Sequence, residues 1–153
     1  MPIVDLNVDY EDVKDADKFE VVPNASYDAV LKTAELGTSG QNSKVPGRPQ
    51  IKWTIGITSP DSGKEVTLFY YTSLPWIPPG ATEIDLDGLG KLVALCKGVG
   101  QPWTGGQVDT DAYIGLAGTV DVVQKNKQEP GPDGRWVDVQ PPEPRNEIKR
   151  FVY

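Results

Sequence analysis

Two aromatic side chains, Phe69 and Tyr71, share one face of a stretch that has the alternating pattern of a β-strand. The same face begins with Glu65 and Thr67, which are residues typical of a sheet face turned toward water. Rings two residues apart on an otherwise polar sheet face are suited to stacking against the bases of a single-stranded nucleic acid. The alternative is that Phe69 and Tyr71 cover a second small hydrophobic core, and this stretch alone leaves both interpretations open.

Basic residues that could neutralise phosphate groups occur in and around this stretch. Lys52 belongs to the preceding alternating segment, two others lie in a Gly-, Ser- and Pro-rich loop at 37–48, and two more begin a Gly/Pro loop at 125–134. Trp76, just after the aromatic segment, is either a hydrophobic plug or an extension of the stacking surface. The candidate nucleic-acid-binding residues are Lys44, Arg48, Lys52, Phe69, Tyr71, Trp76, Lys125 and Lys127.

The composition argues against most catalytic sites. The chain contains no histidine, which removes the commonest general base, the Ser-His and Cys-His nucleophile pairs, and most zinc and iron sites. Its single cysteine, Cys96, lies among leucines and valines, so a buried structural thiol is expected. No phosphate-cradling or dinucleotide-binding motif is present. We therefore expect a protein that is not an enzyme and that needs no metal or cofactor.

The net charge of −7 is unevenly distributed along the chain. Residues 1–20 contain seven acidic residues and two lysines, a net −5, so residues 21–153 carry only −2. We interpret 1–22 as an acidic N-terminal arm, which either solubilises the protein or competes with nucleic acid and docks onto a partner. No apolar run is long enough to span a bilayer and no signal peptide is evident near Met1, so a cytoplasmic protein without membrane association is expected.

The remaining residues, 23–153, contain the pattern of a small β-domain with one helix. We predict strands at about 26–36, two within 50–73, one at 113–124 with a bulge or bend at Gly118, and one at 135–139. An amphipathic helix is expected to begin near Asp85 and to end near Gly98 or Gly100. The closing segment, 147–153, is basic and aromatic and could add an edge strand.

Five strands with one helix after the third is the order of an OB-fold, a small Greek-key barrel. In that fold the ligand lies across strands 2 and 3, flanked by the loops that join strands 1–2 and 4–5. The candidate aromatic and basic residues fall in those elements. The fold class predicted is therefore mostly β, a five-stranded OB-fold barrel with one α-helix between strands 3 and 4.

The chain also resembles, in several short motifs, a phage and prophage family of small proteins that was long classed as a domain of unknown function. Its members are regarded as OB-fold, single-stranded DNA-binding-like proteins. The resemblance lies in Asn7-Val8-Asp9-Tyr10, Ser26-Tyr27-Asp28-Ala29-Val30, Ala34-Glu35-Leu36, the helix end LVALCKGVG at 92–100, and the closing Asn146-Glu147-Ile148-Lys149-Arg150-Phe151. Many bacterial single-stranded DNA-binding proteins end in an acidic tail that recruits partners, whereas this chain ends in basic and aromatic residues.

The resemblance implies a role in phage DNA replication, recombination or repair within a bacterial host cell. Together with the stacking and basic residues, it leads us to expect a sequence-tolerant binder of single-stranded DNA, with phage replication or recombination proteins and further copies of the chain as additional partners. The alternative is a non-enzymatic structural or protein-interaction module of a phage assembly, in which the acidic arm or the aromatic face contacts another protein.

Overall fold

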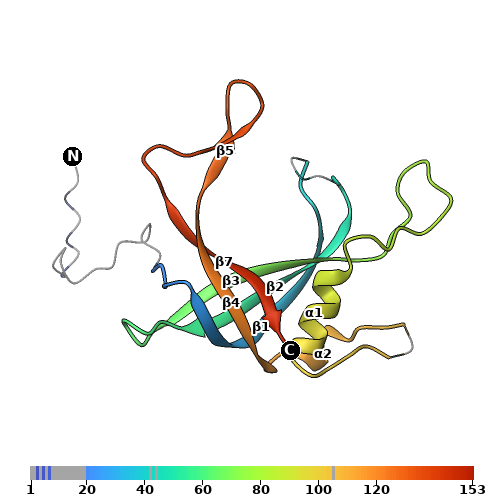
Figure 1. Ribbon diagram of the computed structural model, residues 1–153, viewed down its shortest axis with the longest axis horizontal. Helices are drawn as coiled ribbons and strands as arrows, with labels where there is room; N and C mark the ends of the chain where they lie inside the picture. The colour runs from blue at the N-terminus through green and yellow to red at the C-terminus, as the bar shows by residue number, and fades with distance from the viewer. Residues whose placement is uncertain are drawn as a thin grey trace.

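The computed structural model of the chain describes residues 3, 5, 7, 20–41, 43, 45–104 and 106–153. Five antiparallel strands form the main sheet in the order β3-β2-β1-β4-β7 (Figure 1). These strands are β1 (Ala25–Thr38), β2 (Pro49–Thr58), β3 (Glu65–Ser73), β4 (Ala117–Asn126) and β7 (Pro144–Val152). The mostly β class predicted from the sequence is confirmed. Most of the expected acidic arm, namely residues 1, 2, 4, 6 and 8–19, lies outside the described residues.

The two alternating stretches within 50–73 form the antiparallel pair β2–β3. On their inner face Trp53 is fully buried and donates a hydrogen bond of 2.9 Å from Nε1 to Oγ1 of Thr72. On their outer face Lys52 lies opposite Tyr71 and Thr54 lies opposite Phe69. The period of two in the sequence therefore separates the core from the outer surface of these strands, as predicted.

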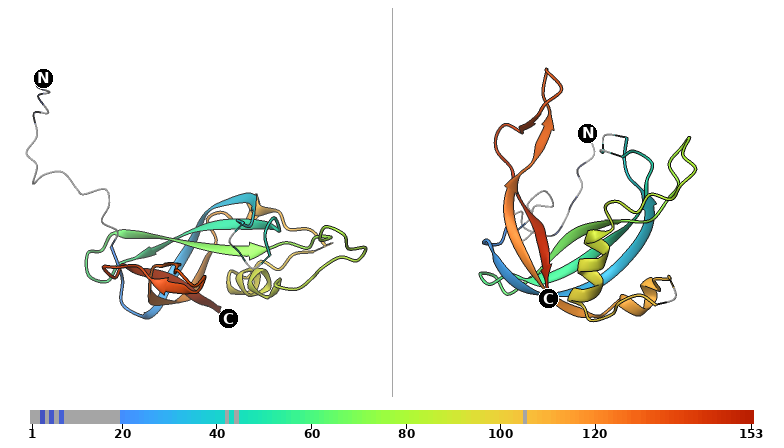
Figure 2. Two further views of the ribbon diagram at one scale, coloured as in Figure 1. Left: turned by 90° about the horizontal axis from the view of Figure 1, so that it is seen from above. Right: turned by 45° about the vertical axis from the view of Figure 1, so that its right-hand side comes forward.

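β1 joins the two halves of the sheet. Its first residues pair with β4 and its later residues pair with β2, with a register shift between Leu31 and Thr33. Such an irregularity lets a strand bend, and both views in Figure 2 show β1, in blue to cyan, curving around the core. The sheet as a whole is consequently strongly curved rather than flat.

The helical segments differ from the expectation. α1 (Gly90–Gly98) begins five residues later than predicted, because Asp85 is held in an extended bridge with Trp76 and Gly88 has a positive φ of 79°. A second, one-turn helix, α2 (Thr110–Tyr113), occupies the expected start of the fourth strand. β4 therefore begins only at Ala117.

A strand forms within the predicted segment 135–139, but its expected place as the fifth strand of the main sheet is wrong. Residues Trp136–Asp138 form β6, which pairs with β5 (Gln128–Pro130) in a separate two-stranded hairpin that projects from the sheet (Figure 1). The fifth strand of the main sheet is β7, which includes the expected edge segment. The physical reason is burial, because Ile148 and Phe151 of β7 fill the core whereas every residue of β5 and β6 is exposed.

The sheet brings its two edge strands, β3 and β7, close together. Because the four pairings are antiparallel, these edges run in the same direction, and the rings of Tyr70 and Phe151 meet edge to face with centroids 5.2 Å apart. α1 packs against both strands. Among the described residues no hydrogen-bonded ladder joins the two edges, so the sheet curves toward closure without completing a barrel.

Gly118 allows α1 to approach β4 rather than forming the expected bulge. It pairs regularly with Ala29, and the register shift in β4 lies between Asp121 and Val122. A Cβ atom at position 118 would lie 2.8 Å from the carbonyl oxygen of Gly98, at the end of α1. The glycine is therefore required for close packing of the helix on the sheet.

Candidate nucleic-acid interface

The outer face of β2–β3 carries the two aromatic side chains singled out in the sequence. Phe69 is 50% exposed and Tyr71 is 46% exposed, so neither is covered by a second core in the described structure. Lys52 extends across this face, with its Nζ atom 4.3 Å from the centroid of the Phe69 ring. This geometry is a cation–π contact, which holds the ammonium group beside the exposed ring.

The polar neighbours of these rings come from the adjoining strands. Thr54 and Lys52 of β2 are in register with Phe69 and Tyr71, and Thr33 and Glu35 of β1 continue the same two rows. Glu35 is exposed and lies opposite Lys52. Farther along the same face Lys32 and Glu65 form an exposed ion pair of 3.0 Å, so ammonium and carboxylate groups occur together here. The face is therefore aromatic rather than strongly basic.

Arg48 does not reach this surface. Its side chain is nearly buried, and Nε donates a hydrogen bond of 3.2 Å to the carbonyl oxygen of Leu74. One terminal nitrogen lies 3.4 Å from a carboxylate oxygen of Asp85. These contacts fasten the start of β2 to the segment that follows β3, so the structure places Arg48 inside the fold. The other candidate in the same loop, Lys44, lies outside the described residues.

Lys125 and Lys127 lie at the other end of the sheet order. β4 is three strands away from β3, and both lysines already contact carboxylates, Lys125 with Glu147 at 3.0 Å and Lys127 with Glu143 at 3.9 Å. All four side chains are more than two-fifths exposed, so these ion pairs are weak and could exchange for a phosphate. The structure does not bring them together with the aromatic rings.

The four tryptophans have different environments. Trp53 lies in the core as expected, Trp103 packs against that core, and Trp136 on the β5–β6 hairpin is exposed. Trp76 is partly buried, and its Nε1 has no hydrogen-bond partner among the described residues. Its backbone pairs with Asp85. Trp76 is therefore packed into the end of the sheet more than it extends the exposed aromatic face.

Nucleophilic and metal chemistry find little support in the described residues. Cys96 is 1% exposed, burial raises the pKa of its thiol, and the hydroxyl of Tyr113 lies 3.4 Å from its Sγ. Burial also raises the pKa of Tyr113, whose hydroxyl donates a hydrogen bond to the carbonyl oxygen of Gln101. Both groups are thus kept in their neutral forms. In the part of the chain described, no cluster of three or more His, Cys, Asp or Glu residues could hold a metal ion.

Two hydrogen bonds lower the pKa of a carboxyl group on the β4–β7 surface. A hydrogen bond from Ser26 and another of 2.6 Å from Nε of Arg150 lower the pKa of Asp121, with smaller contributions from the charges of Arg150 and Lys149. Sequence reasoning noted Lys149 and Arg150 only as basic residues near the C-terminal end. Sequence reasoning did not single out Lys91 of α1, because the residues that surround Lys91 come from strands distant in the sequence.

Comparison of the chain with models of protein families, with curated proteins and with solved structures finds no match. The resemblance to the phage and prophage family therefore stays a prediction. None of the described helices is long and apolar enough to cross a membrane.

Proposed function

We propose that the chain is an OB-fold protein that binds single-stranded DNA without catalysing a reaction and with little sequence preference. The strand order and the position of α1 between β3 and β4 support the fold proposal. So does the contact between the parallel edges β3 and β7, because an OB-fold is a partly open five-stranded barrel. In that fold, strands 2 and 3 carry the ligand-binding surface.

The observation that carries the proposal is the exposure of Phe69 and Tyr71 on β3, with Lys52 held over the Phe69 ring. Leaving two large aromatic rings in water forfeits favourable burial, so a base that stacks on them would recover it. Stacking of this kind tolerates any base, because each presents a π-face. The surface is accordingly suited to sequence-tolerant binding.

The charges near this surface predict modest affinity. Arg48 is occupied by Asp85, and Lys32, Lys125 and Lys127 are paired with glutamates. Among the described residues this leaves Lys52 as the cation held directly over one of the rings. Phosphate neutralisation supplies much of the affinity for nucleic acid. We therefore expect roughly micromolar binding by a single chain that weakens steeply with salt, and stronger binding where several copies bind one strand.

The first test is a titration of a fluorescently labelled thymidine oligomer of about thirty nucleotides, followed by anisotropy at about 50 and 200 mM salt. Saturable binding that weakens with salt would support the proposal. A flat titration with folded protein at low salt would overturn it.

The second test replaces both rings, as Phe69→Ala with Tyr71→Ala. Each stacked base contributes roughly 1–3 kcal/mol, so the double variant should lose most of its binding while remaining folded, because both side chains are half exposed. The matched control removes two exposed apolar side chains at the end of β7, as Val152→Ala with Tyr153→Ala, and should bind as the wild type does. Unchanged affinity in the Phe69/Tyr71 variant would refute the stacking surface.

The cellular role follows from the resemblance stated above. We propose that the protein acts in the replication, recombination or repair of phage or prophage DNA, in the cytoplasm of a bacterial host. Its macromolecular partners would then be single-stranded DNA, proteins of the same process, and further copies of the chain.

A second candidate is a protein-interaction module of a phage assembly. Apolar side chains on the loop after β3 favour it, because Ile77, Ile84 and Leu86 are more than half exposed. Trp136 on the β5–β6 hairpin adds another exposed apolar group. If the oligonucleotide titration shows no binding, a protein-interaction module becomes the better-supported function.

A further inference from the structure

A second cluster of basic side chains lines a pocket beside the start of α1. The pocket has a volume of about 330 Å³ and lies between the first turn of α1 and strands β4 and β7. Because a water molecule occupies about 30 Å³ of the liquid, this space holds roughly ten waters, enough for a phosphate group and part of its hydration shell. Its lining residues are Lys91, Val123, Gln124, Lys125, Glu147, Ile148 and Lys149.

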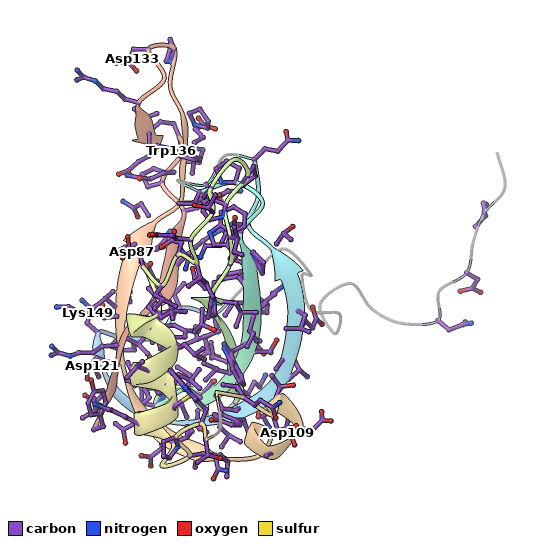
Figure 3. All side chains as sticks on the ribbon, turned by 90° about the vertical axis from the view of Figure 1, so that its right-hand side faces the viewer. Asp87, Asp109, Asp121, Asp133, Trp136 and Lys149 are labelled. Carbon is purple, nitrogen blue, oxygen red and sulfur yellow. The ribbon has the colours of Figure 1, made fainter. Side chains whose placement is uncertain are left out.

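Three lysines and one glutamate give this pocket a net charge of +2 in a chain whose net charge is −7. Lys149 contributes to lowering the pKa of Asp121, but the ion pair of that carboxylate is with Arg150, and Figure 3 shows Lys149 at the edge of the sheet beside α1. Lys91 has no carboxylate partner in the described structure and lies over the ring of Tyr70, with Nζ 5.5 Å from its centroid. Two of the three ammonium groups are therefore available to an anion.

The third lysine is held only loosely. Lys125 contacts Glu147 at 3.0 Å, but both side chains are more than half exposed, so water weakens this pair. A phosphate entering the pocket could share Lys125 with the glutamate at little cost. Glu147 is the single carboxylate among the residues that line the pocket.

The position of Lys91 adds an independent argument. It is the second residue of α1, and the first turn of that helix contains no acidic residue. A cation at this end of a helix is unfavourable because the backbone N–H groups there already carry partial positive charge. A bound anion would offset both the helix end and the lysine.

The pocket lies next to the strand that carries the exposed rings. Lys91 contacts the ring of Tyr70, which lies between Phe69 and Tyr71 in β3 but is buried and points to the opposite face of that strand. We propose that the pocket formed by Lys91, Lys125 and Lys149 binds a phosphate group, namely a backbone phosphodiester of the strand whose bases stack on β3. This source of the phosphate rests on the proposed function, whereas the pocket's preference for phosphate does not.

The main experiment measures how the affinity for the thymidine oligomer depends on salt in the variant Lys91→Gln with Lys149→Gln. Each phosphate neutralised on a single strand contributes about 0.7 to the slope of log K against log salt, so losing the one phosphate bound in the pocket should decrease the slope in magnitude by about 0.7. The matched control, Lys64→Gln with Lys97→Gln, removes two exposed lysines that do not line the pocket and should keep the wild-type slope. A wild-type slope in the Lys91/Lys149 variant would overturn the proposal while leaving single-strand binding intact.

A second measurement tests the pocket without DNA. Inorganic tripolyphosphate is added to ¹⁵N-labelled protein, and shifts of backbone amide resonances are expected at 91, 123–125 and 147–149, and should be lost in the Lys91/Lys149 variant. If the oligomer does not bind but these shifts occur, the proposed function fails and the phosphate is a free ligand. If neither tripolyphosphate nor the oligomer shifts these amide resonances, the pocket does not bind phosphate.

Discussion

At the scale of single residues, the basic side chains of this acidic protein lie in different environments. Arg48 and Lys52 are four residues apart in the sequence, yet the first is buried against Asp85 and the second lies across an exposed ring. Arginine suits the buried position, because its planar guanidinium group can donate to a carbonyl and a carboxylate at once. Proximity in sequence therefore does not imply a shared role.

This contrast gives a prediction about stability. Arg48→Gln removes the charge that pairs with Asp85 and leaves the Leu74 carbonyl without its donor, so it should destabilise the fold by about 2 kcal/mol. Lys52→Gln changes an exposed side chain and should alter stability by less than about 0.5 kcal/mol. Urea unfolding of both variants measures the difference. If Arg48→Gln lowers the free energy of unfolding as little as Lys52→Gln does, Arg48 has no structural role and is again a candidate for binding phosphate.

Sequence reasoning could single out Phe69 and Tyr71, but it could predict neither their exposure nor the burial of Arg48. Phe69 and Tyr71 stand out because they interrupt a polar alternation that one strand reveals by itself. Whether Arg48 faces water depends on Asp85, 37 residues away, and on a bridge between Trp76 and Asp85 that no local pattern encodes.

At the scale of elements, the alternation of buried and exposed residues predicted β2 and β3 but gave β6 and β7 the wrong places in the sheet. β2 and β3 were found because their inner residues alternate strictly with outer ones. β7 was taken for an optional edge, because the register shift opposite Asp121 and Val122 breaks its period and puts Ile148 and Phe151, three residues apart, on the same face. Trp136 and Val137 of β6 have the composition of a strand, but nothing covers them in the described structure.

The contact between α1 and β4 gives a prediction at this scale. Gly118→Ala places a methyl group 2.8 Å from the backbone oxygen of Gly98, and a backbone atom cannot move aside as a side chain can. We expect a loss of about 1–3 kcal/mol of stability, which is typical of overpacking. The matched control is Gly37→Ala in β1, where no atom lies within 4 Å, and it should be neutral or slightly stabilising. Thermal unfolding followed by circular dichroism compares the two, and an unchanged Gly118→Ala variant would contradict the close packing.

At the scale of the whole molecule, the order of elements predicted the sheet better than any single boundary did. Three strands, a helix and further strands favour a curved antiparallel sheet, and the order β3-β2-β1-β4-β7 agrees with that expectation. The approach of β3 to β7 could not be predicted, because it depends on a contact between Tyr70 and Phe151, 81 residues apart. The pocket containing Lys91 and Lys149 likewise depends on residues of α1, β4 and β7 that are distant in the sequence.

Charge is also a property of the whole molecule, and it opposes binding to DNA. Residues 1–19 contain six acidic residues and two lysines, a net −4, so removing them leaves a chain with a net charge of −3. Glu20 should be retained, because its carboxylate accepts a hydrogen bond of 2.8 Å from Ser62 at the β2–β3 turn. Val22 should also be kept, since it is fully buried and its amide donates to Asn146.

We expect the chain that begins at Glu20 to bind the thymidine oligomer several-fold more tightly at about 50 mM salt, because less negative charge repels the phosphates. The gain should shrink above about 0.5 M salt, where screening acts within a few ångströms. A full-length variant with the six acids replaced by Asn or Gln should behave like the truncated chain if charge is responsible. A gain in the truncated chain alone would instead indicate steric obstruction by residues 1–19, and weaker binding in both would show that the acidic residues support the interface.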